Sequence, residues 1–473
     1  MYRTIRVVFQ FFFLGAFSLV SFSQGHEIKV KVEGYTQKSL ILAYQLGNKT
    51  YVQDTAVADN AGVFVFNGKE PLKPGMYIIA EPPAKELLTI LCDERNQRFA
   101  VKTTFKEPVK NAVFTGSVEN KDFNSYVQFI VNQRSKATDL NSKKEDPAAN
   151  AVDIAAIDKK LNELDLAVNQ YQKNFISKHP GSFTSLIIKA NTDPVPPVFS
   201  GTAEEKNRQL LYWTRAHLFD NINLAEEKLL RTPFFASKVD YYIDKLTVQQ
   251  PDSIIQAIDR VISLARASKP NLQFFLTDLL NKYAKSTIIG MDAVYVHIAL
   301  TYYDKGMADW IQQENLDKIL TNARALEPTL IGKIAPDFGL SDANNQLIRL
   351  YDFKAPLTIL FFWSHESDGC RKTAGSVLRV ADRFKDKGVR VLTINCADLP
   401  AGIEAGKAFI TQNKLESLTN LSGTLKIGSI KSQYNIRKTP QLFVLGKNKK
   451  ILFKNLSGEQ LEEQINYFVN LNE

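Results

Sequence analysis

The chain has 473 residues, of which 44% are hydrophobic and 11% aromatic, and its formal net charge is +9. This length suggests about three domains of ~100–200 residues each, and the composition is that of globular domains, which excludes a largely disordered chain. Lysine and acidic residues alternate throughout, and no basic cluster is interleaved with aromatic residues. Nucleic acid is therefore not an expected partner.

The first 23 residues have the pattern of a signal peptide. Arg3 and Arg6 form a basic start, residues 7–20 are apolar, and residues 21–23 include small side chains suited to cleavage. We therefore expect a mature protein in the periplasm (cell envelope) or secreted. No cysteine stands at the cleavage point to carry a lipid. No later stretch approaches the ~18 consecutive apolar residues that span a bilayer, so the protein is not expected to be membrane-spanning.

Residues 24–119 are predicted to form a β-sandwich domain. Ile28, Val30 and Val32 alternate with polar residues, and the apolar segment 63–66 stands between turn signals at 59–62 and 67–68. The other expected strands in this domain are Leu40–Tyr44, Tyr77–Ala80, Leu87–Cys92 and Phe99–Thr103. Their short, regular spacing is typical of an all-β sandwich.

Residues 120–330 have helical periodicity and are predicted to form an all-α middle domain. Apolar residues at alternating three and four spacings run from Ile154 to Phe175, which indicates a long core-facing helix or, alternatively, a coiled-coil seam. The remaining helical patterns are Ala203–Arg231, Phe235–Lys245, Asp252–Ala267, Leu272–Tyr283, Ala293–Tyr303 and Ala308–Leu326. No clustered acid, base or nucleophile stands out in the preceding β domain, residues 24–119.

Residues 331–473 alternate strands with helices, which predicts a largely parallel α/β sheet. In chain order the segments are strand Leu357–Trp363, helix Arg371–Lys385, strand Val389–Asn395, helix Ala405–Asn413, hairpin strands Gln441–Leu445 and Lys450–Lys454, and helix Glu459–Asn472. This order is that of a thioredoxin fold. The whole chain is thus predicted to be multi-domain, with a β-sandwich, an all-α middle domain and an α/β thioredoxin fold.

The C-terminal third resembles the thioredoxin-like, redoxin (TlpA-type) domains of bacterial envelope thiol-disulfide oxidoreductases. The resemblance rests on Ala335-Pro336-Asp337-Phe338, the strand ending at Trp363, the turn Ser367-Asp368-Gly369-Cys370, and Thr439-Pro440 before the hairpin. It implies that Pro440 follows a cis bond and that Trp363, Thr439 and Pro440 bind substrate. Pro74-Gly75-Met76-Tyr77, Leu229-Leu230-Arg231-Thr232-Pro233 and Gly290-Met291-Asp292-Ala293-Val294 resemble segments of the N-terminal β domain and helical middle domain of such proteins.

The turn departs from that family at its attacking position. Family members carry Cys-x-x-Cys there, and Ser367 stands where the first cysteine is expected. The first thiol attacks a disulfide as a thiolate and the second resolves the mixed disulfide, so Cys370 corresponds to the resolving residue. A serine hydroxyl without a strong base does not replace the thiolate. Ser367 also suits a helix N-cap.

Several roles for the remaining thiols are open. Cys370 is a monothiol candidate or a buried, inert thiol. Cys396, which follows a strand, is a possible second thiol at the same sheet edge as Cys370 if their Cα atoms lie within ~7 Å. The Ser-x-x-Cys pattern also resembles that of peroxiredoxins, although Trp363 stands where those enzymes carry proline. Three cysteines are too few for a disulfide framework, and Cys92 is expected to be a buried apolar residue.

The sequence leaves two classes of function open. The first is a redox protein that lacks dithiol exchange and acts through Cys370 as a monothiol, with a thiol reductant. The second is a redox-inactive protein that binds a client peptide or protein in the envelope. No cofactor is expected. No metal site is expected either, because His365, Glu366, Asp368 and Cys370 lie in one short turn, and four such residues seldom converge on a single ion.

Overall fold

The computed structural model describes residues 25–83, 85–146 and 150–471. The expected signal peptide therefore lies outside the described residues. Within them, no helix is long and apolar enough to cross a membrane. The chain divides into two compact units: the first runs to Asp193 and includes Glu227–Ser237, and the second comprises Pro194–Glu226 and Lys238–Glu473.

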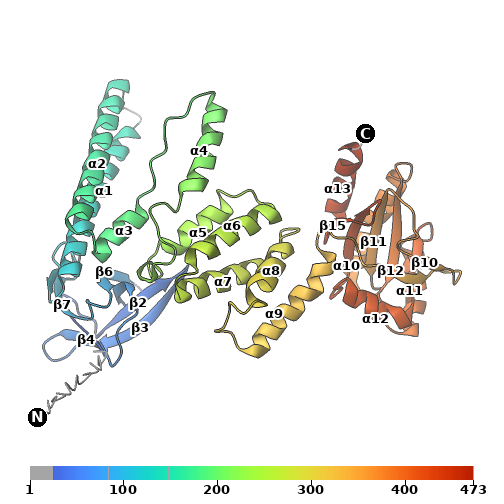
Figure 1. Ribbon diagram of the computed structural model, residues 1–473, viewed down its shortest axis with the longest axis horizontal. Coiled ribbons are helices and arrows are strands. Elements are labelled where there is room, and N and C mark those ends of the chain that lie inside the picture. The colour runs from blue at the N-terminus through green and yellow to red at the C-terminus, as the bar shows by residue number, and fades with distance from the viewer. Residues whose placement is uncertain (1–24, 84, 147–149, 472–473) are drawn as a thin grey trace, which may run out of the picture. The chain divides into compact units, whose positions relative to one another are not determined.

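The first unit begins with two four-stranded sheets, and Figure 1 draws this part of the chain in blue. Its strands are β1 (His26–Glu33), β2 (Ser39–Leu46), β3 (Lys49–Val57), β4 (Val63–Gly68), β5 (Gly75–Glu81), β6 (Lys85–Cys92), β7 (Arg98–Thr104) and β8 (Val113–Thr115). One sheet has the order β4-β1-β7-β8 and the other β3-β2-β5-β6. Ile28 and Val30 from the first sheet share one core cluster with Leu42 and Tyr77 from the second, which confirms the predicted sandwich.

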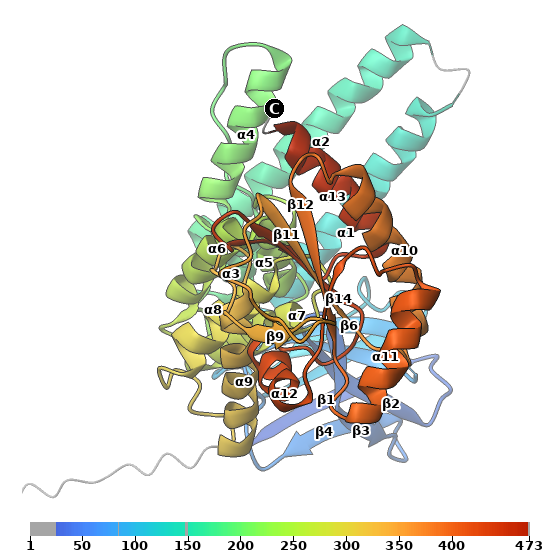
Figure 2. The same ribbon diagram turned by 90° about the vertical axis from the view of Figure 1, so that its right-hand side faces the viewer.

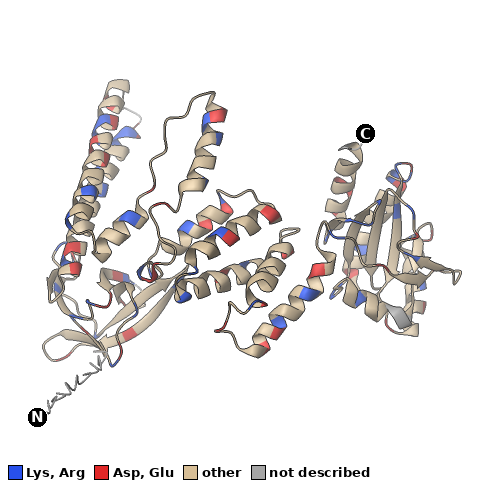
Figure 3. Cartoon of the chain, in the orientation of Figure 1, with Lys and Arg blue, Asp and Glu red and all other residues tan. Residues whose placement is uncertain are grey.

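The first unit continues with the helices α1 (Val118–Lys144), α2 (Ala151–Lys178) and α3 (Phe183–Asn191). The predicted stripe from Ile154 to Phe175 is present on α2, but only Phe175 is buried. The rest of the stripe is half-buried, and α2 runs beside α1, so the prediction of a core-facing helix is wrong over most of its length. Basic and acidic residues are interspersed along both helices (Figure 3), a pattern typical of solvent-exposed helices.

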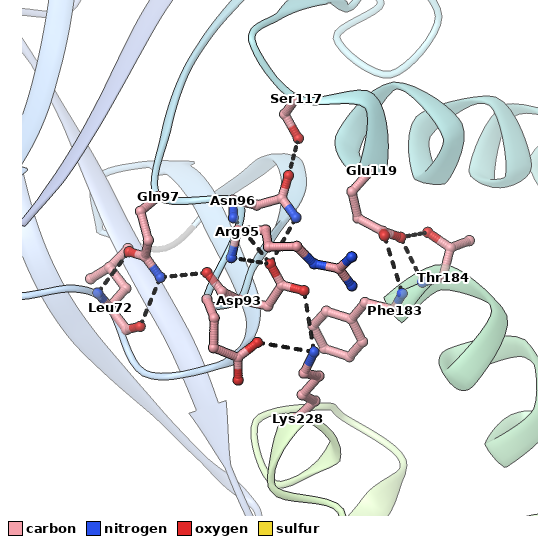
Figure 4. Close-up of polar contacts among 11 residues, drawn as sticks. Leu72, Asp93, Arg95, Asn96, Gln97, Ser117, Glu119, Phe183, Thr184 and Lys228 are labelled. Carbon is pink, nitrogen blue, oxygen red and sulfur yellow. Dashed lines mark hydrogen bonds and ion pairs between the residues drawn. The ribbon is translucent and has the colours of Figure 1, made fainter. Parts of the chain in front are cut away.

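A polar junction joins the loops of the first unit (Figure 4). The buried Asp93 carboxylate accepts hydrogen bonds from the amides of Arg95 and Asn96, both at 3.0 Å, and lies 3.3 Å from Nζ of Lys228. Burial favours the neutral acid, but the hydrogen bonds from the Asn96 side chain and the Arg95 amide, together with the Lys228 charge, outweigh it and hold the pKa of Asp93 below its usual value. The segment that carries Lys228 is thereby fixed to the β domain within this unit.

The second unit contains helices from the middle of the chain and the whole C-terminal α/β region. The helices are α4 (Ala203–His217), α5 (Phe235–Asp244, which begins in the first unit), α6 (Pro251–Ala265), α7 (Lys269–Ala284), α8 (Asp292–Ile298) and α9 (Gln313–Leu326). The predicted helix Ala203–Arg231 is too long, because α4 ends at His217. Beyond it, the Asn223 side chain accepts a hydrogen bond from the amide of Ala225 at 3.0 Å, a turn that competes with helix.

The C-terminal region has a five-stranded sheet of order β13-β12-β11-β14-β15. Its elements are β11 (Leu357–Trp363), α10 (Asp368–Arg383), β12 (Val389–Asn395), α11 (Pro400–Gln412), β13 (Thr419–Leu421), α12 (Thr424–Gln433), β14 (Gln441–Gly446), β15 (Ile451–Lys454) and α13 (Gly458–Leu471), preceded by the short pair β9 (Gly339–Ser341) and β10 (Leu347–Arg349). β11 pairs in parallel with β12 and antiparallel with β14.

Two helical layers cover this sheet. Alternate residues of β11 pack on opposite faces: Phe361 joins the core cluster that includes α10 and α13 residues, and Phe362 joins the cluster that includes α12 residues. Figure 2 shows the strands between these two layers. The arrangement confirms the predicted α/β region and places the start of α10, the end of β12 and the start of β14 at one sheet edge.

Candidate functional site

Ser367 is the N-cap of α10, and its hydroxyl makes two hydrogen bonds within the fold. Its Oγ accepts a hydrogen bond from the amide of Cys370 at 3.3 Å, as a helix N-cap does. The same hydroxyl donates to the backbone carbonyl of Thr439 at 3.2 Å. The N-cap prediction is confirmed. Because the hydroxyl proton is directed at a carbonyl and not at a base, nothing in this contact activates Ser367 as a nucleophile.

Cys370 lies in the first turn of α10 and is 0% exposed. It belongs to the same core cluster as Trp363, Ala374 and Val377. The amide of Ser364 donates to its Sγ at 3.5 Å. A thiol in this position has no direct path to a substrate disulfide, since exchange requires contact between the two sulfur atoms.

Thr439 and Pro440 stand opposite this turn, immediately before β14. The peptide bond between them is cis, and both residues are half-buried. A Cβ placed on Gly369 would lie 3.1 Å from Cδ of Pro440, so the turn and the proline are in contact. The structure therefore brings Ser367, Cys370, Thr439 and Pro440 together.

Trp363 is the predicted site residue whose position differs most from its expected role. It is 1% exposed and its ring stacks on Phe409 with centroids 4.4 Å apart. In this conformation it has no surface with which to contact a client. The tryptophan instead supports the turn from within the core, because it ends the strand that leads into Ser364.

Cys396 lies at the same sheet edge but on the other face. Its amide donates to the carbonyl of Trp363 at 2.8 Å, as expected for neighbouring parallel strands. Its side chain packs in the cluster with α12, whereas Cys370 packs in the cluster with α10, and both thiols are free. Burial raises the pKa of the Cys396 thiol to about 12, against the opposing charge of Lys431.

A pocket of about 520 Å³ opens at this edge. Its lining includes His365, Cys396, Asp398, Lys431, Arg437 and Thr439. Lys431 is paired with Asp398 at 2.7 Å, and Nδ1 of His365 is buried without a hydrogen-bond partner among the described residues. Sequence reasoning did not identify Asp398, Lys431 or Arg437. The rule that places ligands at the carboxyl ends of parallel strands could have found Asp398, which follows β12.

His365, Glu366 and Asp368 do not converge. His365 lies 3.9 Å from the Glu366 carboxylate, while Asp368 contacts Arg371. Across the described residues, no group of three or more histidine, cysteine, aspartate or glutamate side chains is arranged to hold a metal ion.

A central parallel strand pair, a following antiparallel hairpin and a helix that starts opposite a cis-proline define a thioredoxin-like domain. Residues 331–454 match the AhpC/TSA family. The thiol-disulfide oxidoreductase ResA of Bacillus thuringiensis subsp. konkukian is 27% identical over 139 residues, which are 29% of this chain and 76% of that protein. ResA of Bacillus cereus strain ZK / E33L is 29% identical over 140 residues, with the same two shares.

A thioredoxin-like protein from Bacteroides caccae is a structural neighbour with 18% identity and a TM-score of 0.46, covering 60% of this chain and 98% of its own. Residues 26–123 and 169–325 match two domain families of unknown function, DUF4369 and DUF5106. The C-terminal domain is therefore thioredoxin-like, and it is similar to the TlpA-type thiol-disulfide oxidoreductases.

Proposed function

We propose that this chain is an envelope protein whose thioredoxin-like domain binds a client peptide at the Thr439-Pro440 edge without dithiol exchange. The observation that carries the proposal is the closed state of the turn: Cys370 is 0% exposed, and Ser367 uses its hydroxyl within the fold. The basic start and apolar segment of residues 1–23 support export to the periplasm.

The peptide-binding part of the proposal rests on the geometry of the sheet edge. Thr439 and Pro440 are half-buried beside the 520 Å³ pocket, which has room for a side chain of a bound peptide. The exposed Arg437 and Lys438 precede them. An extended client segment laid along this edge would find backbone groups, a pocket and positive charge.

A second candidate function is monothiol exchange by Cys370. It is favoured by the position of the thiol in the first helical turn and by the amide of Ser364, which donates to Sγ. In this mechanism the thiolate of Cys370 attacks one sulfur of a client disulfide, and the other sulfur leaves as a thiolate. A small thiol then attacks the Cys370 sulfur, so that the client leaves as a second thiolate and Cys370 is bonded to the small thiol. A second molecule of that thiol frees Cys370 and carries away both small-thiol groups as a disulfide. It requires the turn to open first.

Insulin reduction and mixed-disulfide trapping separate the two functions. We compare the wild type, Cys370→Ala and Ser367→Cys. For a binding protein, the wild type is as inactive as Cys370→Ala, and Ser367→Cys gains reduction by at least about 100-fold because it restores an attacking thiolate at the helix start. Wild-type adducts that disappear in Cys370→Ala would establish the monothiol function and contradict our proposal.

The binding edge is tested by trapping at the attacking position. Ser367→Cys combined with Cys370→Ala should retain the insulin B chain as a mixed disulfide, since no resolving thiol remains. Ser432→Cys combined with Cys370→Ala is the matched control, because residue 432 is an exposed serine of the same domain, in α12. Equal trapping by the two variants would show that the edge near Pro440 has no preference for a peptide.

A further inference from the structure

Two sequence segments that resemble family segments meet in the first unit although about 155 residues separate them. Met76, in Pro74-Gly75-Met76-Tyr77, donates its amide to the carbonyl of Arg231 at 3.0 Å. A Cβ on Gly75 would lie only 2.4 Å from Cβ of Arg231. Glycine at 75 therefore lets the Arg231 backbone and the base of its side chain pack directly on the start of β5.

Arg231 is a buried cation whose hydrogen-bonding capacity is mostly unused. It is 7% exposed. Its guanidinium lies 5.5 Å from the ring centroid of Tyr44, and one nitrogen donates to the carbonyl of Pro74 at a long 3.4 Å. None of the carboxylates in the described residues pairs with it. A guanidinium has five N–H donors, and burying it without a counter-charge is costly.

A pocket of about 500 Å³ adjoins this guanidinium. Its lining includes Arg231, Tyr44 and Tyr77, and the exposed Lys69 and Lys73 add two positive charges. Glu70 is the one acidic residue of the lining. The backbone carbonyl of Glu70, not its carboxylate, is hydrogen-bonded to Nδ1 of His26 at 2.7 Å. Cations thus outnumber carboxylates three to one, which favours an anionic occupant.

We propose that this pocket binds a small molecule through a carboxylate or phosphate group that pairs with Arg231. The planar guanidinium is suited to such groups because it donates two parallel hydrogen bonds to them. The cation–π contact of the guanidinium with Tyr44 and the packing of the aliphatic part of Arg231 on Gly75 hold the side chain in place before the ligand arrives, which lowers the entropic cost of binding. The volume lies within the range of small-molecule sites, about 300–1,000 Å³. The site belongs to the β domain and goes beyond the function proposed for the thioredoxin-like domain.

Calorimetric titration of the full mature chain at low ionic strength tests this site. The probes are inorganic phosphate, glucuronate and the neutral methyl glucoside. We expect saturable single-site binding of phosphate or glucuronate and none of methyl glucoside, and the preferred anion identifies the ligand group. Arg231→Gln should weaken the affinity by at least roughly 10-fold, and Arg231→Lys by less, since lysine keeps the charge but loses the paired donors.

Lys102→Gln is the matched control, because Lys102 is an exposed lysine of the same domain that pairs with Glu33 at 2.8 Å and does not line the pocket. If Arg231→Gln fails to fold, Lys73→Gln replaces it with an expected loss of about 2- to 5-fold. The Nε–H signal of Arg231, assigned by its absence from Arg231→Lys, should shift on titration. No saturation by either anion up to about 10 mM, or an equal loss in Lys102→Gln, would overturn the proposal.

Discussion

Ser367 in the thioredoxin-like domain and Arg231 in the first unit differ in how far the fold satisfies their hydrogen-bonding groups. The Ser367 hydroxyl accepts one hydrogen bond and donates another, both within the fold. Arg231 is more deeply buried than Ser367, yet its side chain makes one long hydrogen bond and faces a pocket lined with further cations. Ser367, at the position associated with chemistry, thus has its hydrogen bonds satisfied within the fold. Arg231, from a region without an assigned activity, keeps donors that a ligand could use. Family resemblance alone would have directed attention to the first.

The close approach of Gly75 to Arg231 gives the largest expected effect on stability. Gly75→Ala places a methyl group 2.4 Å from Cβ of Arg231, and relief requires a backbone shift. We expect a loss of about 2–3 kcal/mol in the free energy of unfolding, as for other overpacked sites, measured by urea denaturation.

Gly181→Ala is the control for this variant, since no atom lies within 4 Å of a Cβ there. It should change stability by no more than about 0.5 kcal/mol. Equal behaviour of the two variants would mean that Arg231 is not held tightly against β5, and the contrast with Ser367 would weaken.

The Asp93 junction tests whether the segment carrying Arg231 is fixed by charge. Asp93→Asn should destabilise the protein by about 1–3 kcal/mol at pH 7, because Lys228 loses its buried partner. The pKa of Asp93 is lowered in the folded state, so its contribution is present above the unfolded pKa of about 3.9 and is lost as pH falls through the folded value.

The difference in stability between wild type and Asp93→Asn should therefore shrink below about pH 4. Thermal unfolding of both proteins between pH 3 and pH 7, in steps of about one pH unit, measures this difference. Asp165→Asn is the control, because Asp165 is an exposed residue of α2. A difference that does not change with pH would show that the Asp93 charge does not hold the junction.

The sequence predicted those helices and strands whose own residues carry a clear apolar pattern, and it missed those that do not. β11 and β12 were predicted to the residue because both are short, mainly apolar segments that are buried on two faces, apart from the exposed Arg390 of β12. β3 was missed because it is mostly exposed and lacks apolar alternation. α12 was missed as well, and its Gly428 and serines have low helix propensity.

The same distinction holds for the sites. The N-cap bond of Ser367 spans three residues and was predictable from residue type, whereas its bond to the Thr439 carbonyl spans 72 residues. The burial of Trp363 and the meeting of Gly75 with Arg231 likewise depend on tertiary packing. No periodicity in the sequence encodes such contacts, so only the folded structure could reveal them.

The smallest expected effect belongs to Ser367 itself. Ser367→Ala removes both the cap bond to Cys370 and the bond to Thr439, and should lower the free energy of unfolding by about 1 kcal/mol. Ser367→Gly also loses the hydrogen bond to Thr439. It should keep most of the N-cap stabilisation, because glycine is well tolerated at an N-cap. The informative measurement is the labelling rate of Cys370 by a thiol-specific probe in a background where Cys92 and Cys396 are alanine. If labelling is slow in the wild type and accelerates in Ser367→Ala, the serine keeps the thiol enclosed as well as capping the helix. Fast labelling in the wild type would mean that the turn opens readily, and the closed state on which the contrast with Arg231 rests would not describe the protein in solution.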